Sequence, residues 1–220
     1  MKIHSRWSRP RMFGAWPASA GVVAGAALVL GGCASKPKPT QSGFLSTYER
    51  LESRDAYRSE HVSPELARYE RFIVHPVEVR VEPDLLTADD LAGLAEHFHS
   101  ACVRVLEAEG LIVTGEPGEG VARVRLALTD IAKSTPWQKI HPGARFAGAG
   151  TGGAAMEGEI VDSITGEQLA AVVRADSGNQ FNLTAFSTVD DVRGAIDKWA
   201  ADGARALREL RAARDDPPGP

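Results

Sequence analysis

The chain of 220 residues contains 25 Lys and Arg and 29 Asp and Glu, which gives a net charge of −4 at neutral pH. Four of the basic residues precede Cys33 and all acidic residues follow it, so the part from Cys33 onward carries a net charge of −8. Such an acidic chain lacks the basic surface that binds nucleic acid, and we expect no nucleic-acid partner.

Residues 1–32 have the pattern of a bacterial lipoprotein signal peptide. The first eleven residues carry four basic and no acidic side chains, and a stretch of small apolar residues, 18–30, follows. This stretch is shorter than the ~20 apolar residues that a membrane-spanning helix needs. We therefore expect a cleaved signal rather than a permanent membrane span.

The apolar stretch ends in Leu30, Gly31, Gly32 and Cys33, which resemble a lipobox. This pattern predicts cleavage between Gly32 and Cys33 and lipidation of the Cys33 thiol. One acyl chain gives only marginal membrane binding, whereas the three chains expected on Cys33 would hold the protein on the bilayer. Because Ala34 rather than Asp follows the cysteine, we expect the outer membrane, with the protein facing the periplasm.

Composition divides the remaining chain into three parts. Residues 33–62 are polar and contain prolines, which indicates a lipidated N-terminus and tether. Residues 63–212 are long enough for one core, and we expect a single domain there. Residues 213–220 are too polar and too rich in proline to bury a surface, so a disordered tail is expected.

Hydrophobic periodicity predicts the elements of the domain. Alternation predicts a strand over 71–81 that is interrupted at Pro76. Thr87 and Asp90 resemble a capping box, and the helix that they open should end at Gly110. Three short strands are expected next, at 111–113, 121–131 and 156–162.

The last strand, 167–175, should form a hairpin with the one before it, because Gly166 suits the turn. Ser187 or Thr188 then caps a final amphipathic helix. The order β-α-β-β-β-β-α predicts an α+β domain, in which two helices pack on one face of a largely antiparallel sheet.

Several segments resemble a family of uncharacterised bacterial lipoproteins that is classed as a domain of unknown function. The first is Gly43-Phe44-Leu45-Ser46-x-Tyr48-x-x-Leu51, shortly after the lipobox. The others lie in 121–130, 159–167 and 186–200. The resemblance covers nearly the whole chain after the signal, and it implies a lipoprotein without implying an activity.

Two motifs could indicate a bound cofactor or metal, but neither has the neighbouring elements or ligands that such a site requires. The glycine-rich stretch 148–153 has the spacing of a dinucleotide-binding loop, but a strand rather than a helix follows it. His97 and His99 point to different faces of their helix, and no second ligand pair accompanies His99 and Cys102. We expect no cofactor and no metal site, and we interpret Cys102 as a buried, inert thiol.

Catalytic residues are not evident either. Asp162 and Ser163 lie in the hairpin turn without a nucleophile-elbow sequence, and we expect Asp162 to accept hydrogen bonds from turn amides. His75 lies on the inner face of its strand, where a hydrogen-bonded core histidine is the usual outcome. We expect a protein that is not an enzyme.

The long connection 135–155 contains the aromatic residues Trp137 and Phe146. Long loops without a pattern of their own are often functional, so these two residues are candidates for contact with an envelope protein partner. The alternative is that they pack under the edge of the domain. The leading hypothesis is a non-enzymatic envelope binding protein. Its rival is a periplasmic hydrolase or small-ligand carrier, with a polar pocket between helices and sheet that His75 or Asp130 would face.

Overall fold

The computed structural model describes residues 41–81, 86–132, 153–177 and 188–215. Eight strands, one 3-10 helix and two long helices are formed in these ranges. In chain order they are β1 (Glu52–Asp55), β2 (Arg58–Val62), η1 (Pro64–Arg68), β3 (Arg71–Val74), β4 (Glu78–Val79), α1 (Ala88–Ala108), β5 (Ile112–Val113), β6 (Val121–Ala132), β7 (Gly153–Asp162), β8 (Gln168–Ser177) and α4 (Thr188–Asp215).

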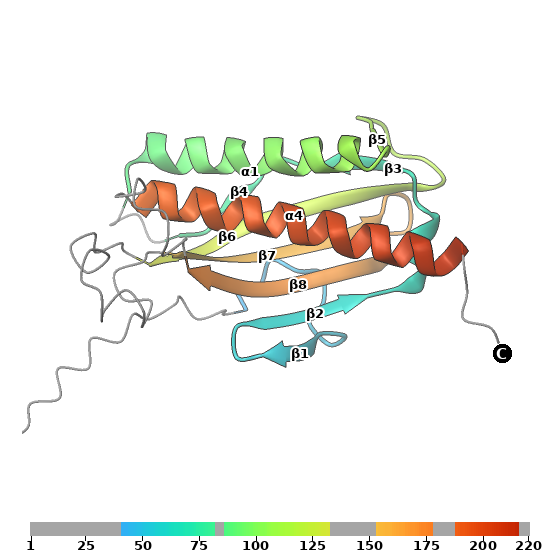
Figure 1. Ribbon diagram of the computed structural model, residues 1–220, viewed down its shortest axis with the longest axis horizontal. Helices are drawn as coiled ribbons and strands as arrows, with labels where there is room; N and C mark the ends of the chain where they lie inside the picture. The colour runs from blue at the N-terminus through green and yellow to red at the C-terminus, as the bar shows by residue number, and fades with distance from the viewer. Residues whose placement is uncertain (1–40, 82–85, 133–152, 178–187, 216–220) are drawn as a thin grey trace, which may run out of the picture. The chain divides into compact units, whose positions relative to one another are not determined.

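One sheet unites all eight strands in the order β1-β2-β8-β7-β6-β3-β5, and β4 pairs with β6 beyond the end of β3. The pairs among β1, β2, β8, β7 and β6 are antiparallel, whereas β3 and β4 run parallel to β6. Helices α1 and α4 lie side by side on one face of this sheet (Figure 1). The α+β class predicted from the sequence is confirmed.

The helix ends follow from local sequence. Thr87 Oγ1 accepts a hydrogen bond from the Asp90 amide at 3.1 Å, and the Asp90 carboxylate accepts from the Thr87 amide at 3.2 Å, which confirms the capping box of α1. Gly110 adopts a φ of 74° just after α1, a conformation that ends helices and favours glycine. Helix α4 starts at Thr188. Ser187, the other residue predicted as its cap, lies outside the described residues.

The main core lies between the two helices and the sheet. Buried side chains of β6, Val124, Leu126 and Leu128, point to this face, as their alternation predicted. From the helices, Phe98 and Trp199 meet with their ring centroids 5.7 Å apart. All the residues of both cores lie between Phe44 and Leu210.

The polar tether predicted over 33–62 is wrong from residue 42 onward. Phe44 and Leu45 are buried, and β1 and β2 form a hairpin that pairs with β8. The hairpin was missed because β1 is fully exposed and β2 is charged, so neither strand shows apolar alternation. The predicted element order therefore lacked two strands and η1.

Smaller boundary differences have local causes. Pro76 has no N–H for the ladder, and it divides the single strand predicted over 71–81 into β3 and β4. Strand β7 begins at Gly153, three residues before the predicted start, because small residues continue the ladder with β6. The remainder of the predicted loop, with Trp137 and Phe146, lies outside the described residues.

The hairpin between β7 and β8 is closed by Asp162, as predicted. Its Oδ1 accepts hydrogen bonds from the amides of Ile164 at 2.8 Å and Thr165 at 2.7 Å, and its Oδ2 accepts one from the Tyr69 hydroxyl at 2.8 Å. The hydrogen bonds from Thr165, with those from Tyr69 and Ile164, lower the pKa of Asp162 to about 2. Gly166 follows with a φ of 74°, which the turn requires.

We expect Asp162→Ala to reduce the free energy of unfolding by ~1–3 kcal/mol in urea titrations at pH 7, because it leaves turn amides without acceptors. The pKa of Asp162 is lower in the folded state than its ordinary value of 3.8, so the ionised carboxylate stabilises the fold at pH values above 3.8. This contribution is lost as the pH falls through about 2. The difference from wild type should therefore shrink below pH 4. Glu167→Ala, an exposed change in the same turn, is the control, and equal losses for the two variants at pH 7 would contradict the assignment.

Candidate functional site

Four residues singled out by the sequence lie outside the described residues. They are Gly32 and Cys33 at the expected cleavage and lipidation site, and Trp137 and Phe146 in the expected contact loop. Their roles stay predictions. Within the described residues, no helix is long and apolar enough to cross a membrane.

The residues of the rejected metal motif on α1 face different neighbours. His97 Nε2 lies 2.8 Å from Asp197 Oδ1 on α4, whereas His99 Nε2 lies 3.3 Å from the carbonyl oxygen of Val74. Burial raises the pKa of the Cys102 thiol to about 12, so it stays protonated and is a poor nucleophile at neutral pH. Across the described ranges, no three His, Cys, Asp or Glu side chains are grouped so that they could hold a metal ion.

The residues considered for a hydrolase are also separated. Ser163 Oγ accepts a hydrogen bond from the Gly118 amide and donates one to the Gly118 carbonyl, each at 3.0 Å. His75 lies between β3 and β4 rather than in a strand, and its buried Nε2 has no hydrogen-bond partner among the described residues, contrary to the expected hydrogen-bonded histidine. Burial, together with the charges of Arg123 and Arg125, lowers the pKa of His75.

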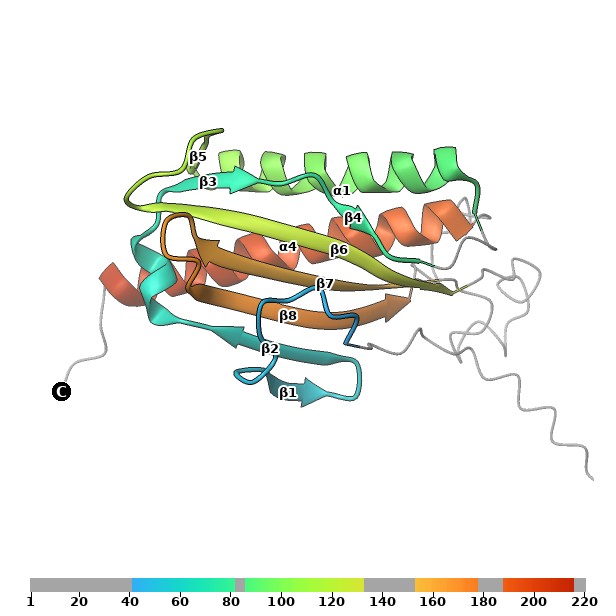
Figure 2. The ribbon, with the colours of Figure 1, turned by 180° about the vertical axis from the view of Figure 1, so that it is seen from behind.

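The segment 42–51, which carries the Gly-Phe-Leu-Ser motif, packs on the face of the sheet opposite the helices. Figure 2 shows it crossing β7 and β8 on that side. We call it the docked segment. Its apolar side chains Phe44 and Leu45 form a second small core with Ala127, Ala171 and Val173 of the sheet.

Two buried carboxylates of β7 hold the docked segment. Glu157, which is 0% exposed, accepts hydrogen bonds from the Ser42 amide and the Tyr48 hydroxyl. Burial and the bond to Glu157 raise the pKa of Tyr48, so the phenol remains a donor. Glu159, which is 2% exposed, accepts from the Ser46 amide at 2.9 Å and from the Ser46 hydroxyl at 2.7 Å.

Two arginine side chains also take part in the contact between the docked segment and the sheet. The guanidinium of Arg125 donates a hydrogen bond to Glu159 Oε1 at 2.6 Å and lies 4.9 Å from the centre of the Phe44 ring. Arg80 lies over the same ring at 5.2 Å and donates a hydrogen bond to the Ser42 carbonyl at 3.3 Å. A buried carboxylate is costly without such partners, so the segment and the sheet depend on each other.

Sequence reasoning missed this contact because it treats charged residues that alternate with apolar ones as a solvent-exposed face. Glu157 and Glu159 alternate with Met156, Gly158 and Ile160 in that way. The available signal was the motif itself, since Phe44 and Leu45 are too apolar for a free tether.

A second polar group, also missed, joins β8 to α4. Arg174 binds Asp176 at 2.8 Å through Nε and Asp202 at 3.1 Å through Nη1. Lys198 and the Trp199 indole N–H donate to the same Asp176 carboxylate. Burial alone would raise the pKa of Asp176, but the hydrogen bonds from Lys198 and Trp199 hold it below the usual value. We call these five residues the α4 polar cluster.

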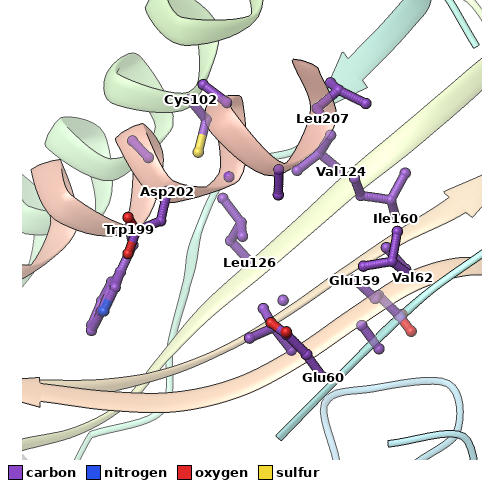
Figure 3. Close-up of a pocket in the computed structure, with 18 of the residues that line it drawn as sticks. Glu60, Val62, Cys102, Val124, Leu126, Glu159, Ile160, Trp199, Asp202 and Leu207 are labelled. Carbon is purple, nitrogen blue, oxygen red and sulfur yellow. The ribbon is translucent and has the colours of Figure 1, made fainter. Parts of the chain in front are cut away.

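An apolar pocket of about 200 Å³ lies between the two helices and the sheet. In Figure 3, Leu126, Ile160 and Val62 of the sheet lie across the pocket from Trp199 and Leu207 of α4. The rival hypothesis required a polar pocket, and neither His75 nor Asp130 lines this one. The lining therefore offers no hydrolytic group from that hypothesis, although it does offer space for an apolar ligand.

Comparison with solved structures gives low similarity. The chain is similar to PelC of Paraburkholderia phytofirmans, described as a dodecamer, with 13% identity, a TM-score of 0.42, and coverage of 64% of this chain and 93% of that one. A minor lipoprotein of Acinetobacter baumannii gives 10% identity, a TM-score of 0.34, and coverage of 66% and 95%. A Xanthomonas campestris protein of the family DUF330 gives 12% identity, a TM-score of 0.38, and coverage of 71% and 94%.

These likenesses are too weak for an argument about function, and a search of curated proteins gives no match. A family model does match, over residues 40–203, a range that begins at the docked segment and includes the whole sheet, α1 and more than half of α4. The predicted lipobox, residues 30–33, lies before the matched range. The uncharacterised family expected from the sequence is confirmed: the chain belongs to the family of proteins of unknown function DUF3313.

Proposed function

We propose that this protein is a membrane-anchored lipoprotein that faces the periplasm, is held in the outer membrane through acylated Cys33, and acts as a non-enzymatic binding protein. The lipobox supports the anchor. The observation that carries the proposal is the docked segment, because it ties the chain to the sheet from Ser42 onward.

The docked segment limits how far the domain could move from its anchor. Only eight residues lie between Cys33 and Ser42. A fully extended chain covers at most ~3.3–3.6 Å per residue, so the span is no more than ~30 Å. A freely mobile tether that reached residue 62 would be about three times as long. The proposed anchor would therefore keep the domain close to the lipid surface.

The described side chains support a binding role rather than catalysis. The Cys102 thiol has a pKa raised to about 12, Ser163 is engaged with the Gly118 backbone, and Asp162 is engaged in its turn. Catalytic groups usually stand together in a cleft with partners that activate them. These three are held by structural hydrogen bonds or burial instead.

We expect Cys33→Ala to prevent lipidation, so that unprocessed precursor accumulates or protein is recovered in the soluble fraction. Cys102→Ala removes the other cysteine and should leave membrane recovery unchanged. Cell fractionation with immunoblotting, together with mass spectrometry of the mature N-terminus, measures both. Wild-type processing and membrane recovery of Cys33→Ala would overturn the anchor.

We expect Glu159→Ala to loosen the docked segment, because it leaves the Ser46 donors and Arg125 without their carboxylate. The local cost should be ~1–3 kcal/mol, which raises the rate of trypsin cleavage at Arg50 about 5- to 150-fold. Glu107→Ala, an exposed change on α1 at the opposite face of the sheet, is the control, because it leaves the residues around Arg50 unchanged. Equal cleavage rates in the two variants would show that the carboxylate does not hold the segment.

The binding role predicts a protein partner in the envelope. Crosslinking in intact cells followed by denaturing purification should recover the same partner repeatedly. If Trp137 and Phe146 form the contact, changing both to Ala should lower the crosslinked yield at least about fivefold, since large aromatic residues often dominate interfaces. Repeated recovery of the protein alone would contradict the binding role, and an unchanged yield would exclude these two residues.

A further inference from the structure

The two helices do not cover the whole face of the sheet on which they lie. Neighbouring strands are ~4.8 Å apart and a helix is ~10 Å wide, so two helices cover about four strands. The sheet path contains seven strands. Figure 1 shows α1 and α4 over the part around β3 to β7, with β2 and β1 beyond them.

The apolar pocket extends from this uncovered boundary to α1, since its lining includes Val62 of β2 and also Phe98 and Cys102 of α1. Val62 of β2 pairs with Ala170 of β8, so its side chain continues the helix-facing surface of the sheet. On the opposite side α4 presents small residues, Ala200, Gly203 and Ala204, which leave room above the strands. The pocket exists because small side chains face an incompletely covered sheet.

The size and the lining favour an apolar ligand. At about 200 Å³ the pocket exceeds the engineered apolar cavity of ~150 Å³ that binds benzene. Its lining includes Phe98, Leu126, Val172 and Leu207, with hardly any polar surface. A narrow apolar chain matches this lining better than a polar metabolite, which would lose its hydrogen bonds to water on entry.

A polar pocket of about 300 Å³ adjoins the apolar one. The two pockets share Arg58, Arg174 and Asp202. The polar pocket also includes Lys198, which donates to Asp176, and the carboxylates Asp55 and Asp176, so its charged side chains are balanced in sign. A ligand with an apolar chain and a polar head would place each part in a matching environment.

We propose that the joined pockets form a binding site for an amphiphile, with an acyl chain between the helices and the sheet and a polar head among the charged side chains of the polar pocket. This inference goes beyond the proposed envelope role and does not require the Cys33 anchor. The acyl chain could come from a free membrane lipid or from the protein's own lipidated cysteine, since the chemistry is the same.

The first test uses residues 34–220, which contain both cores and lack the anchor. Titration with the fluorescent fatty acid cis-parinaric acid should give saturable binding near one per chain. Gly203→Leu should weaken it at least about tenfold, because the Cβ position of Gly203 is in open space beside the pocket and a leucine there would occupy it. Gly194→Leu is the matched control, since it is also a glycine of α4 with open space but lies outside the pocket lining.

Circular dichroism and thermal unfolding should show all three chains folded, because leucine favours a helix more than glycine does. Lack of saturable binding by the unaltered chain would overturn the proposal. Equal affinity of Gly203→Leu and Gly194→Leu would overturn it as well. Both outcomes leave the Cys33→Ala result untouched, so failure of the site and failure of the anchor are distinguishable.

Lipid analysis of the processed protein, purified from membranes, identifies the source of the chain. A noncovalent lipid near one per protein, reduced in Gly203→Leu and retained in Gly194→Leu, would identify a free membrane lipid. If residues 34–220 bind the probe but the processed protein carries no such lipid and binds no probe, its own acyl chains fill the pocket. Either result supports the acyl-chain site.

Discussion

The contact between two buried carboxylates of β7 and the docked segment determines how this fold is organised. Without the segment, Glu157 and Glu159 would belong to an ordinary solvent-exposed sheet face. With it, both are almost completely buried and accept hydrogen bonds from Ser42, Ser46 and Tyr48. The sheet therefore has a core on each face, with helices on one and a short stretch of irregular chain on the other.

This arrangement explains why the family match begins where it does. The matched range starts at residue 40, immediately before the docked segment and well before the first strand. The motif in 43–51 supplies the donors and apolar side chains that the β7 carboxylates and the outer face of the sheet need. It is part of the fold rather than a linker, and the residues that connect it to Cys33 are few.

The sequence predicted elements whose signals are local. The capping box at Thr87, the helix end at Gly110, and the turn formed by Asp162 and Gly166 all depend on neighbouring residues, and the structure confirms them. It failed where a residue's environment is set by a distant segment. Glu157 and Ser42 are 115 positions apart, and nothing in either local pattern indicates that they meet.

The pockets illustrate the same limit. Gly203 and Ala204 fit an amphipathic stripe equally well whether they pack tightly or leave space, because periodicity reports the direction of a side chain and not the distance to the opposite wall. Likewise, Arg174 and Asp176 belong to β8 and Asp202 to α4, and only the packing of α4 against β8 makes them one cluster. Topology could be predicted to class level, whereas cavities and ion-pair clusters required the packed structure.

The two edges of the sheet have a consequence for crowding. Strand β1 exposes all four of its residues, three of which are charged, and β5 at the opposite edge is only two residues long. Charged or very short edge strands discourage pairing with strands of other molecules. A protein confined to a lipid surface meets its own copies far more often than one free in solution, and these edges would let such copies collide without joining into continuous sheets.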